Sequence, residues 1–122
     1  MNQVQKQEEL EKRLKEFTLR VLKLIKSLPR TEENIIYGRQ VIRSSSSIGA
    51  NYAEATCAHT NADFSHDLNK CRKESKETIY WLELIFGTNP SLQTRMLPLI
   101  DEGRQIFKIF MSSVKTAKER QK

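Results

Sequence analysis

The feature that most constrains the fold is a long segment without proline, between Pro29 and Pro90. It contains the sequence RSSSSIGANYAE, residues 43–54, whose run of serines would ordinarily indicate a loop. Apolar and small residues nevertheless continue through it at alternating steps of three and four, the spacing of a helix packed against its neighbours. We therefore expect a helix whose small side chains let a second helix come close. This stripe consists of Ile35, Gly38, Ile42, Ser45, Gly49 and Tyr52.

The same spacing recurs in three other segments, and signals for helix ends lie between them. Thr31 can cap the second helix and Asn61 or Thr60 the third, while Pro29 and Gly87 can end the helices that precede them. Only four glycines and three prolines occur, which leaves room for few turns. We predict an all-α fold, an antiparallel up-down-up-down four-helix bundle that forms one domain over residues 1–122. The helices are expected at about 5–28, 32–58, 61–86 and 91–117, with a polar tail at 118–122.

The third helix is apolar around most of its circumference near its end, at residues 79–86. A bundle core buries only one stripe of each helix, so the surplus apolar side chains need another partner. Aromatic side chains dominate the energy of many interfaces between proteins. We therefore predict that Tyr80, Trp81 and Leu84 anchor an interface through which the chain associates with copies of itself.

A row of polar side chains lies beside the stripe of the second helix. It consists of Arg43, Ser47, Asn51 and Glu54. Because a buried charge must be paired, we predict a structural network in which Arg43 meets Glu74 or Glu77 of the third helix. A small-molecule site is the alternative. The structural network is favoured because buried polar groups are ordinarily satisfied by other protein groups.

The net charge of +6 is concentrated in the outer parts of the chain. Residues 1–30 hold eight Lys or Arg and four acids, and residues 91–122 hold seven and three. Basic side chains without a neutralising neighbour suit contact with the phosphates of a nucleic acid, and a solvated helix face is the alternative interpretation. The predicted contacts are Lys23, Lys26, Arg30, Arg104, Lys108, Lys115 and Lys118, and Lys122 continues the line on the fourth helix.

Motifs for catalysis are missing from the sequence. There is no Glu-x-x-His pair of the kind that di-metal bundles need. Two cysteines and two histidines, Cys57, Cys71, His59 and His66, match no common zinc spacing. The serines of residues 44–47 have no partner base and no strand-turn-helix elbow. We predict that the chain is not an enzyme and holds no metal or cofactor, with a metalloenzyme as the least favoured alternative.

The cellular location follows from two further features. No run of apolar residues approaches the ~20 that cross a bilayer, and the N-terminal sequence MNQVQKQEEL lacks the core of a signal peptide. The two cysteines do not form a disulfide framework. We therefore expect a cytoplasmic protein with reduced thiols.

Three motifs together resemble a known family. They are RSSSSIGANYAEA at residues 43–55, Asp63-Phe64, and KESKETIYWLELI at residues 73–85. The chain is similar to the bacterial four-helix-bundle proteins, which are also called 23S rRNA intervening-sequence proteins. A related branch is the accessory protein of diversity-generating retroelements. Departures from the family pattern, at Tyr52, Ala55 and Cys71, concern packing. The resemblance implies the bundle and a homo-oligomeric ring of five subunits.

The resemblance and the basic stripes together favour one function class. We expect a non-catalytic oligomeric scaffold that binds nucleic acid or a nucleic-acid-processing partner. RNA is favoured because the family is linked to an rRNA intervening sequence, and the retroelement branch implies a reverse transcriptase as one such partner. The alternative is a protein-interaction module without affinity for nucleic acid.

Overall fold

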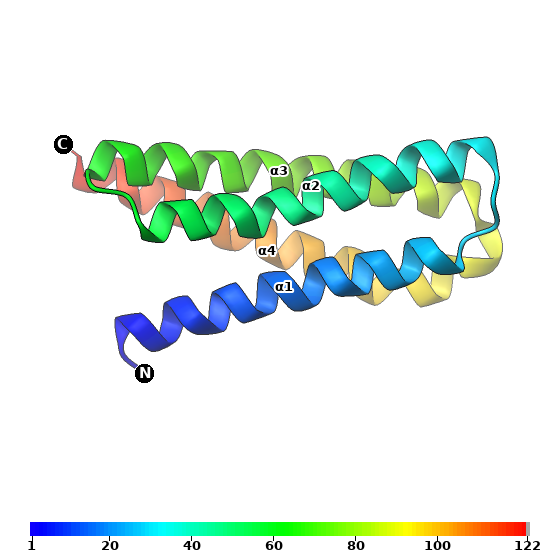
Figure 1. The fold of residues 1–122 in the computed structure, drawn as a ribbon, viewed down its shortest axis with the longest axis horizontal. Helices are drawn as coiled ribbons and strands as arrows, with labels where there is room; N and C mark the ends of the chain where they lie inside the picture. The colour runs from blue at the N-terminus through cyan, green and yellow to red at the C-terminus, as the bar shows by residue number, and fades with distance from the viewer. Residues whose placement is uncertain (122) are drawn as a thin grey trace.

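Four long helices form the protein in a computed structural model that describes residues 1–121 (Figure 1). Successive helices run in opposite directions, and both chain ends lie at the same end of the bundle (Figure 1). The predicted all-helical four-helix bundle is thus confirmed, with no strand in the described part of the chain. Lys122, the last residue of the predicted tail, lies outside the described residues. The helices are α1 (Gln3–Ser27), α2 (Glu32–Thr56), α3 (Asn61–Thr88) and α4 (Gln93–Arg120), with a 3-10 turn, η1 (Pro90–Leu92), before α4.

Side-chain caps explain where two of the helices begin. The hydroxyl of Thr31 accepts a hydrogen bond from the backbone N–H of Asn34 at 3.2 Å, and Thr60 caps α3 in the same way at Asp63. The expected stop at Gly87 is wrong, because α3 continues through it to Thr88. Gly87 has an ordinary negative φ, so it does not form the left-handed turn that ends many helices.

The predicted apolar stripes of α1 and α3 form most of their buried faces. On α2 the prediction is wrong in part, because Ile35 is exposed and Ile42 is only half-buried. The buried face is rotated toward α3 and includes Val41, Ser44 and Ile48. The reason is that α2 packs much more extensively against α3 than against α1, so its buried face is turned toward α3. The buried residues of α1 and α3 include Leu14, Phe17, Val21, Leu24, Leu68, Cys71, Ser75, Thr78, Leu82 and Ile85.

Of the two glycines in the predicted stripe of α2, Gly38 lies at a close approach to α1 and Gly49 does not. A methyl group at Gly38 would lie 2.8 Å from Cγ2 of Ile25, whereas one at Gly49 would lie 3.7 Å from Cβ of Leu14, an ordinary contact. Figure 1 shows the cause: α1 lies beside α2 near the turn that joins them and diverges from it toward the N-terminus. This divergence opens a groove along the outer half of the pair.

Polar groups join the helices inside the bundle and at one of its ends. The hydroxyls of Ser44 on α2 and Thr78 on α3 are hydrogen-bonded at 2.8 Å, and both are fully buried. At the end that holds the α1–α2 and α3–α4 turns, the side-chain amides of Asn34 and Asn89 donate to each other at 2.9 and 2.8 Å. This buried amide pair was not predicted. It ties the two turns together because each amide satisfies the other away from water.

Candidate nucleic-acid interface

The outer surface between α3 and α4 is hollowed into a groove of about 700 Å³. Four cations line it, two from each helix: Lys73, Lys76, Arg104 and Lys108. The apolar part of the lining comes from Ile79, Tyr80, Phe107 and Met111, and two acids, Glu77 and Glu83, complete it. We call this hollow the α3–α4 groove. Its surplus of basic over acidic side chains makes it attractive to a polyanion.

Ion pairs within the protein determine how much of this positive charge remains available to a ligand. Within residues 1–121, none of the four groove cations forms an ion pair. Glu77, the acid nearest in sequence to Lys76, is engaged elsewhere by Arg43 and Trp81. Arg13 on α1 is different, since it forms two hydrogen bonds of 2.7 and 2.8 Å with Glu102. That contact raises the pKa of the Arg13 guanidinium and holds its charge internally.

Lys76 also reaches over an aromatic ring of the groove. Its Nζ lies 5.2 Å from the ring centre of Phe107, within the range of a cation–π contact. Phe107 itself is half-buried, so the lysine lies above the ring on the outside of the bundle. The contact places the ammonium group of Lys76 over the apolar part of the groove lining.

The structure divides the predicted basic residues into two distant groups. Those of α4, Arg104, Lys108, Lys115 and Lys118, are exposed and continue from the groove toward the end where the chain termini lie. Those of the first helix and its turn, Lys23, Lys26 and Arg30, are exposed at the opposite end of the bundle. Lys26 and Arg30 line a separate hollow there together with Arg39. One short ligand cannot contact both groups on a single chain.

Two groove cations, Lys73 and Lys76, were not predicted. Both lie on the outward face of α3, three residues apart. In the sequence they alternate with Glu74 and Glu77, which suggests local neutralisation. The structure turns these acids toward α2, where Arg43 contacts both, and leaves the lysines facing α4. The sequence did contain a signal for this arrangement. On a helix, Glu74 and Glu77 lie at a different angle around the axis from Lys73 and Lys76, so the acids and the lysines face different neighbours.

The predicted polar row is partly joined to α3. Arg43 forms ion pairs with Glu77 and, at 3.4 Å, with Glu74. Its side chain is 46% exposed, so this is a surface contact and not the buried charge that the sequence suggested. Ser47 and Asn51 bond to the backbone of their own helix, at the carbonyls of Arg43 and Ser47. The exposed Glu54 forms no ion pair within residues 1–121.

The three predicted interface anchors have different surroundings. Trp81 is half-buried: its ring centre lies 6.0 Å from that of Tyr37, and its N–H donates to Glu77 at 3.1 Å. Leu84 is also half-buried. Tyr80 alone is exposed, at 55%, and it lines the α3–α4 groove. The structure therefore joins the polar row and the aromatic residues through Glu77, which bonds both Arg43 and Trp81.

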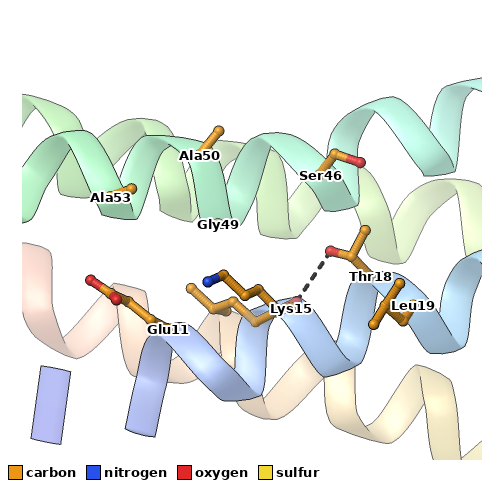
Figure 2. Close-up of a pocket in the computed structure, with 9 residues that line it drawn as sticks. Glu11, Lys15, Thr18, Leu19, Ser46, Gly49, Ala50 and Ala53 are labelled. Atoms are coloured by element: carbon orange, nitrogen blue, oxygen red, sulfur yellow. Dashed lines mark hydrogen bonds between the residues drawn. The ribbon is translucent and has the colours of Figure 1, made fainter. Parts of the chain in front are cut away.

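A second groove, of about 520 Å³, lies between α1 and α2 where the helices diverge (Figure 2). Figure 2 shows its α2 wall, which carries only small side chains: Ser46, Gly49, Ala50 and Ala53. The α1 wall includes Leu19, which is 63% exposed, while Glu11 and Lys15 supply one charge of each sign. We call this hollow the α1–α2 groove. Its shape and small residues suit an apolar side chain from another protein surface.

The surroundings of Cys71 and of the four consecutive serines do not activate them. Burial raises the pKa of the Cys71 thiol to about 12, so this group remains a protonated, unreactive thiol at neutral pH. The hydroxyls of Ser44 to Ser47 each bond a backbone carbonyl of their own helix. No cluster of three His, Cys, Asp or Glu side chains in residues 1–121 could hold a metal ion. No helix of the described chain is long and apolar enough to cross a membrane.

The fold and both grooves define an antiparallel four-helix bundle with a basic outer face, and comparisons with known proteins narrow this class. The family described as 23S rRNA-intervening sequence protein matches residues 6–112. The chain belongs to this family, which confirms the resemblance found in the sequence motifs.

A solved structure supports the same assignment. The chain is similar to a crystal structure from Bacteroides thetaiotaomicron, described as a protein with unknown function from the S23 ribosomal protein family. The two are 34% identical, with a TM-score of 0.80, and the match covers 90% of this chain and 98% of that chain. The comparison with curated proteins finds no match.

Proposed function

We propose that the protein is a non-catalytic scaffold that binds nucleic acid through the α3–α4 groove. The observation that carries the proposal is the set of four cations around one groove, none of them paired within the described chain. Phosphate contacts by Lys and Arg supply most of the affinity of non-specific binding, because each contact releases condensed counterions. Lys115 and Lys118 extend the same surface along α4 and can follow a longer strand.

RNA is the favoured ligand. The family is described by an intervening sequence of 23S rRNA, which links its members to RNA more directly than to DNA. A reverse transcriptase or another nucleic-acid-processing enzyme is a second class of partner, as the retroelement branch suggests. An enzymatic role is not part of the proposal, because catalysis needs an activated group and the buried Cys71 thiol and bonded serines are not activated.

Self-association into a ring of five subunits, in the cytoplasm, completes the proposal. Apolar side chains that remain in solvent on one chain support it, among them Leu19, Ile36 and Leu97. In a cyclic assembly each α3–α4 groove would be repeated by the symmetry. Weak phosphate contacts would then add up through avidity when one RNA reaches several subunits.

The α1–α2 groove supports a second candidate function, a protein-interaction module without affinity for nucleic acid. Its lining is small and apolar, and it carries no surplus of positive charge. Such a groove fits a leucine or a similar side chain on a partner helix. Under this alternative the basic surface of α4 would be a solvated face that keeps the protein soluble.

A binding assay on the full chain tests the proposal. Fluorescence anisotropy with labelled RNA, single-stranded DNA and duplex DNA is measured at low salt for the wild type and for Lys108→Glu combined with Lys115→Glu. The reversal should lower affinity for every ligand while light scattering shows an unchanged mass. The control, Lys12→Glu combined with Lys15→Glu, makes the same change of net charge on α1 and should bind as the wild type does. A wild-type protein without affinity for any ligand would overturn the proposal and favour the protein-interaction module.

A further inference from the structure

An exposed aromatic ring lies among the cations of the α3–α4 groove. Tyr80 is 55% exposed and lines the groove together with Lys73, Lys76, Arg104 and Lys108. Tyr80 is not part of the bundle core. More than half of its surface is therefore open to a ligand that the surrounding cations attract.

The ring is held in a fixed orientation. Its centre lies 5.1 Å from that of Trp81 with an interplanar angle of 76°, an edge-to-face contact. Trp81 is itself held by the hydrogen bond to Glu77 and by its contact with Tyr37. Glu77 is fixed in turn by Arg43. This chain of contacts reduces the entropy that Tyr80 would lose on binding, so the ring is prepared for a planar partner.

We infer that the α3–α4 groove binds a single strand, with an unpaired base stacked on Tyr80 and flanking phosphates on the four cations. The inference rests on the proposed function and specifies its ligand. Single-strand sites combine a basic groove with aromatic rings on which bases stack, and any base offers the required face. A duplex keeps its bases inside, so it can use the cations but not the ring. Single-stranded RNA and DNA share this chemistry.

The opposite side of the groove fits the same ligand. Met111 on α4 is 50% exposed and lines the groove with Tyr80, so the site offers a second apolar surface to a base. The soft thioether of methionine packs well against aromatic rings. Phe107 is less available because it is half-buried beneath the ammonium group of Lys76. Tyr80 is therefore the main stacking residue, and the phosphates are held on both sides of it.

The test compares two variants at one position. Tyr80→Leu keeps an apolar side chain but removes the aromatic face, and Tyr80→Phe keeps the face. The full-length protein is titrated with an oligo-uridine RNA, an oligo-thymidine DNA and a duplex of the same length. Trp81, the single tryptophan of the chain, reports on its neighbour, so stacking on Tyr80 should quench its fluorescence.

We expect Tyr80→Leu to lower affinity for both single strands by roughly tenfold to a hundredfold, to abolish the quenching, and to leave duplex binding unchanged. Tyr80→Phe should behave as the wild type. The inference alone fails if the wild type binds duplex as tightly as single strand, or if Tyr80→Leu leaves single-strand affinity intact. It also fails if light scattering shows a lower mass for Tyr80→Leu, since Tyr80 would then be an interface residue. Absence of binding to all three ligands would overturn the proposed function as well.

Discussion

The two grooves of the bundle have similar sizes and opposite linings. The α1–α2 groove, of about 520 Å³, is walled by small and apolar side chains, and its two charges are of opposite sign. The α3–α4 groove, of about 700 Å³, is walled by four cations, two acids and an exposed tyrosine. The presence of a hollow between two helices therefore does not by itself indicate which kind of ligand binds there. The side chains at its rim decide whether it suits another protein or a polyanion.

The two grooves also arise in different ways. The first exists because α1 diverges from α2 beyond Gly38, so backbone separation creates the space. In the second, Gly103 of α4 still lies close to α1 and α3, since a methyl group there would be 3.3 Å from Phe17 and 3.6 Å from Ile79. Long side chains standing on both sides of a close helix contact form its walls.

Charge reversal at the two grooves should give the largest difference in RNA affinity. Arg104→Glu combined with Lys108→Glu removes two phosphate contacts, each worth about tenfold in affinity near 50 mM salt, so RNA binding should weaken on the order of a hundredfold. Anisotropy with labelled RNA measures the loss. Lys12→Glu combined with Lys15→Glu, on the side of the α1–α2 groove, should change affinity by less than about twofold. Equal losses in both variants would mean that net charge, and not the α3–α4 groove, governs binding.

The two glycines of α2 should respond in opposite directions. Gly38→Ala places a methyl group 2.8 Å from Ile25 and should destabilise the fold by about 1–3 kcal/mol. Gly49→Ala, in the open α1–α2 groove, has room for the methyl and should stabilise the helix by about 0.5–1 kcal/mol. Urea unfolding followed by circular dichroism gives both values. Similar effects at the two positions would show that α1 does not diverge as described.

Self-association should depend on the α1–α2 groove and not on the cations. If a copy of the chain covers this groove, Leu19→Ala removes buried apolar surface and should weaken the contact by about 1–2 kcal/mol. Light scattering over a dilution series would then show smaller species at higher concentrations than for the wild type. RNA affinity per subunit should not change. If Leu19→Ala shows the same mass as the wild type at every concentration, the α1–α2 groove is not part of the assembly.

Coupling between Arg43 and Glu77 should be small but measurable. Because the arginine is 46% exposed, a double-mutant cycle with Arg43→Met and Glu77→Gln should give about 0.2–1 kcal/mol. The matched control is Arg43 with Glu54, which lie in the same predicted row without contact, and their coupling should be close to zero. Equal coupling in both cycles would mean that the ion pair in the structure contributes nothing specific.

Helical spacing predicted most of the fold. Apolar and small residues at steps of three and four identified most of the buried faces of α1 and α3. It failed on α2, where Val41 and Ser44 are buried and Ile35 is exposed. The helical period does not tell which neighbour α2 contacts most, and in the structure that neighbour is α3. The amide pair of Asn34 and Asn89 was also missed, since residues far apart in sequence meet only in the folded bundle.

The candidate site was predictable in part for a related reason. The line of cations on α4 follows from spacing within one helix. Lys73 and Lys76 complete the groove from α3, and their contribution depends on how that helix is rotated against α4. The exposure of Tyr80 depends on the same rotation. The rotation of α3 leaves Tyr80 exposed and its sequence neighbour Trp81 half-buried. Sequence alone grouped the two as interface anchors.

If the four cations of the α3–α4 groove, which form no ion pair within residues 1–121, contact phosphates, then wild-type binding should depend steeply on salt concentration. The logarithm of the association constant for a short single-stranded RNA is plotted against the logarithm of salt concentration. Four contacts at about 0.7 released counterions each predict a slope near −3, and Arg104→Glu with Lys108→Glu should reduce its magnitude by about 1.4. A slope close to zero, or a slope that the double variant leaves unchanged, would contradict the claim.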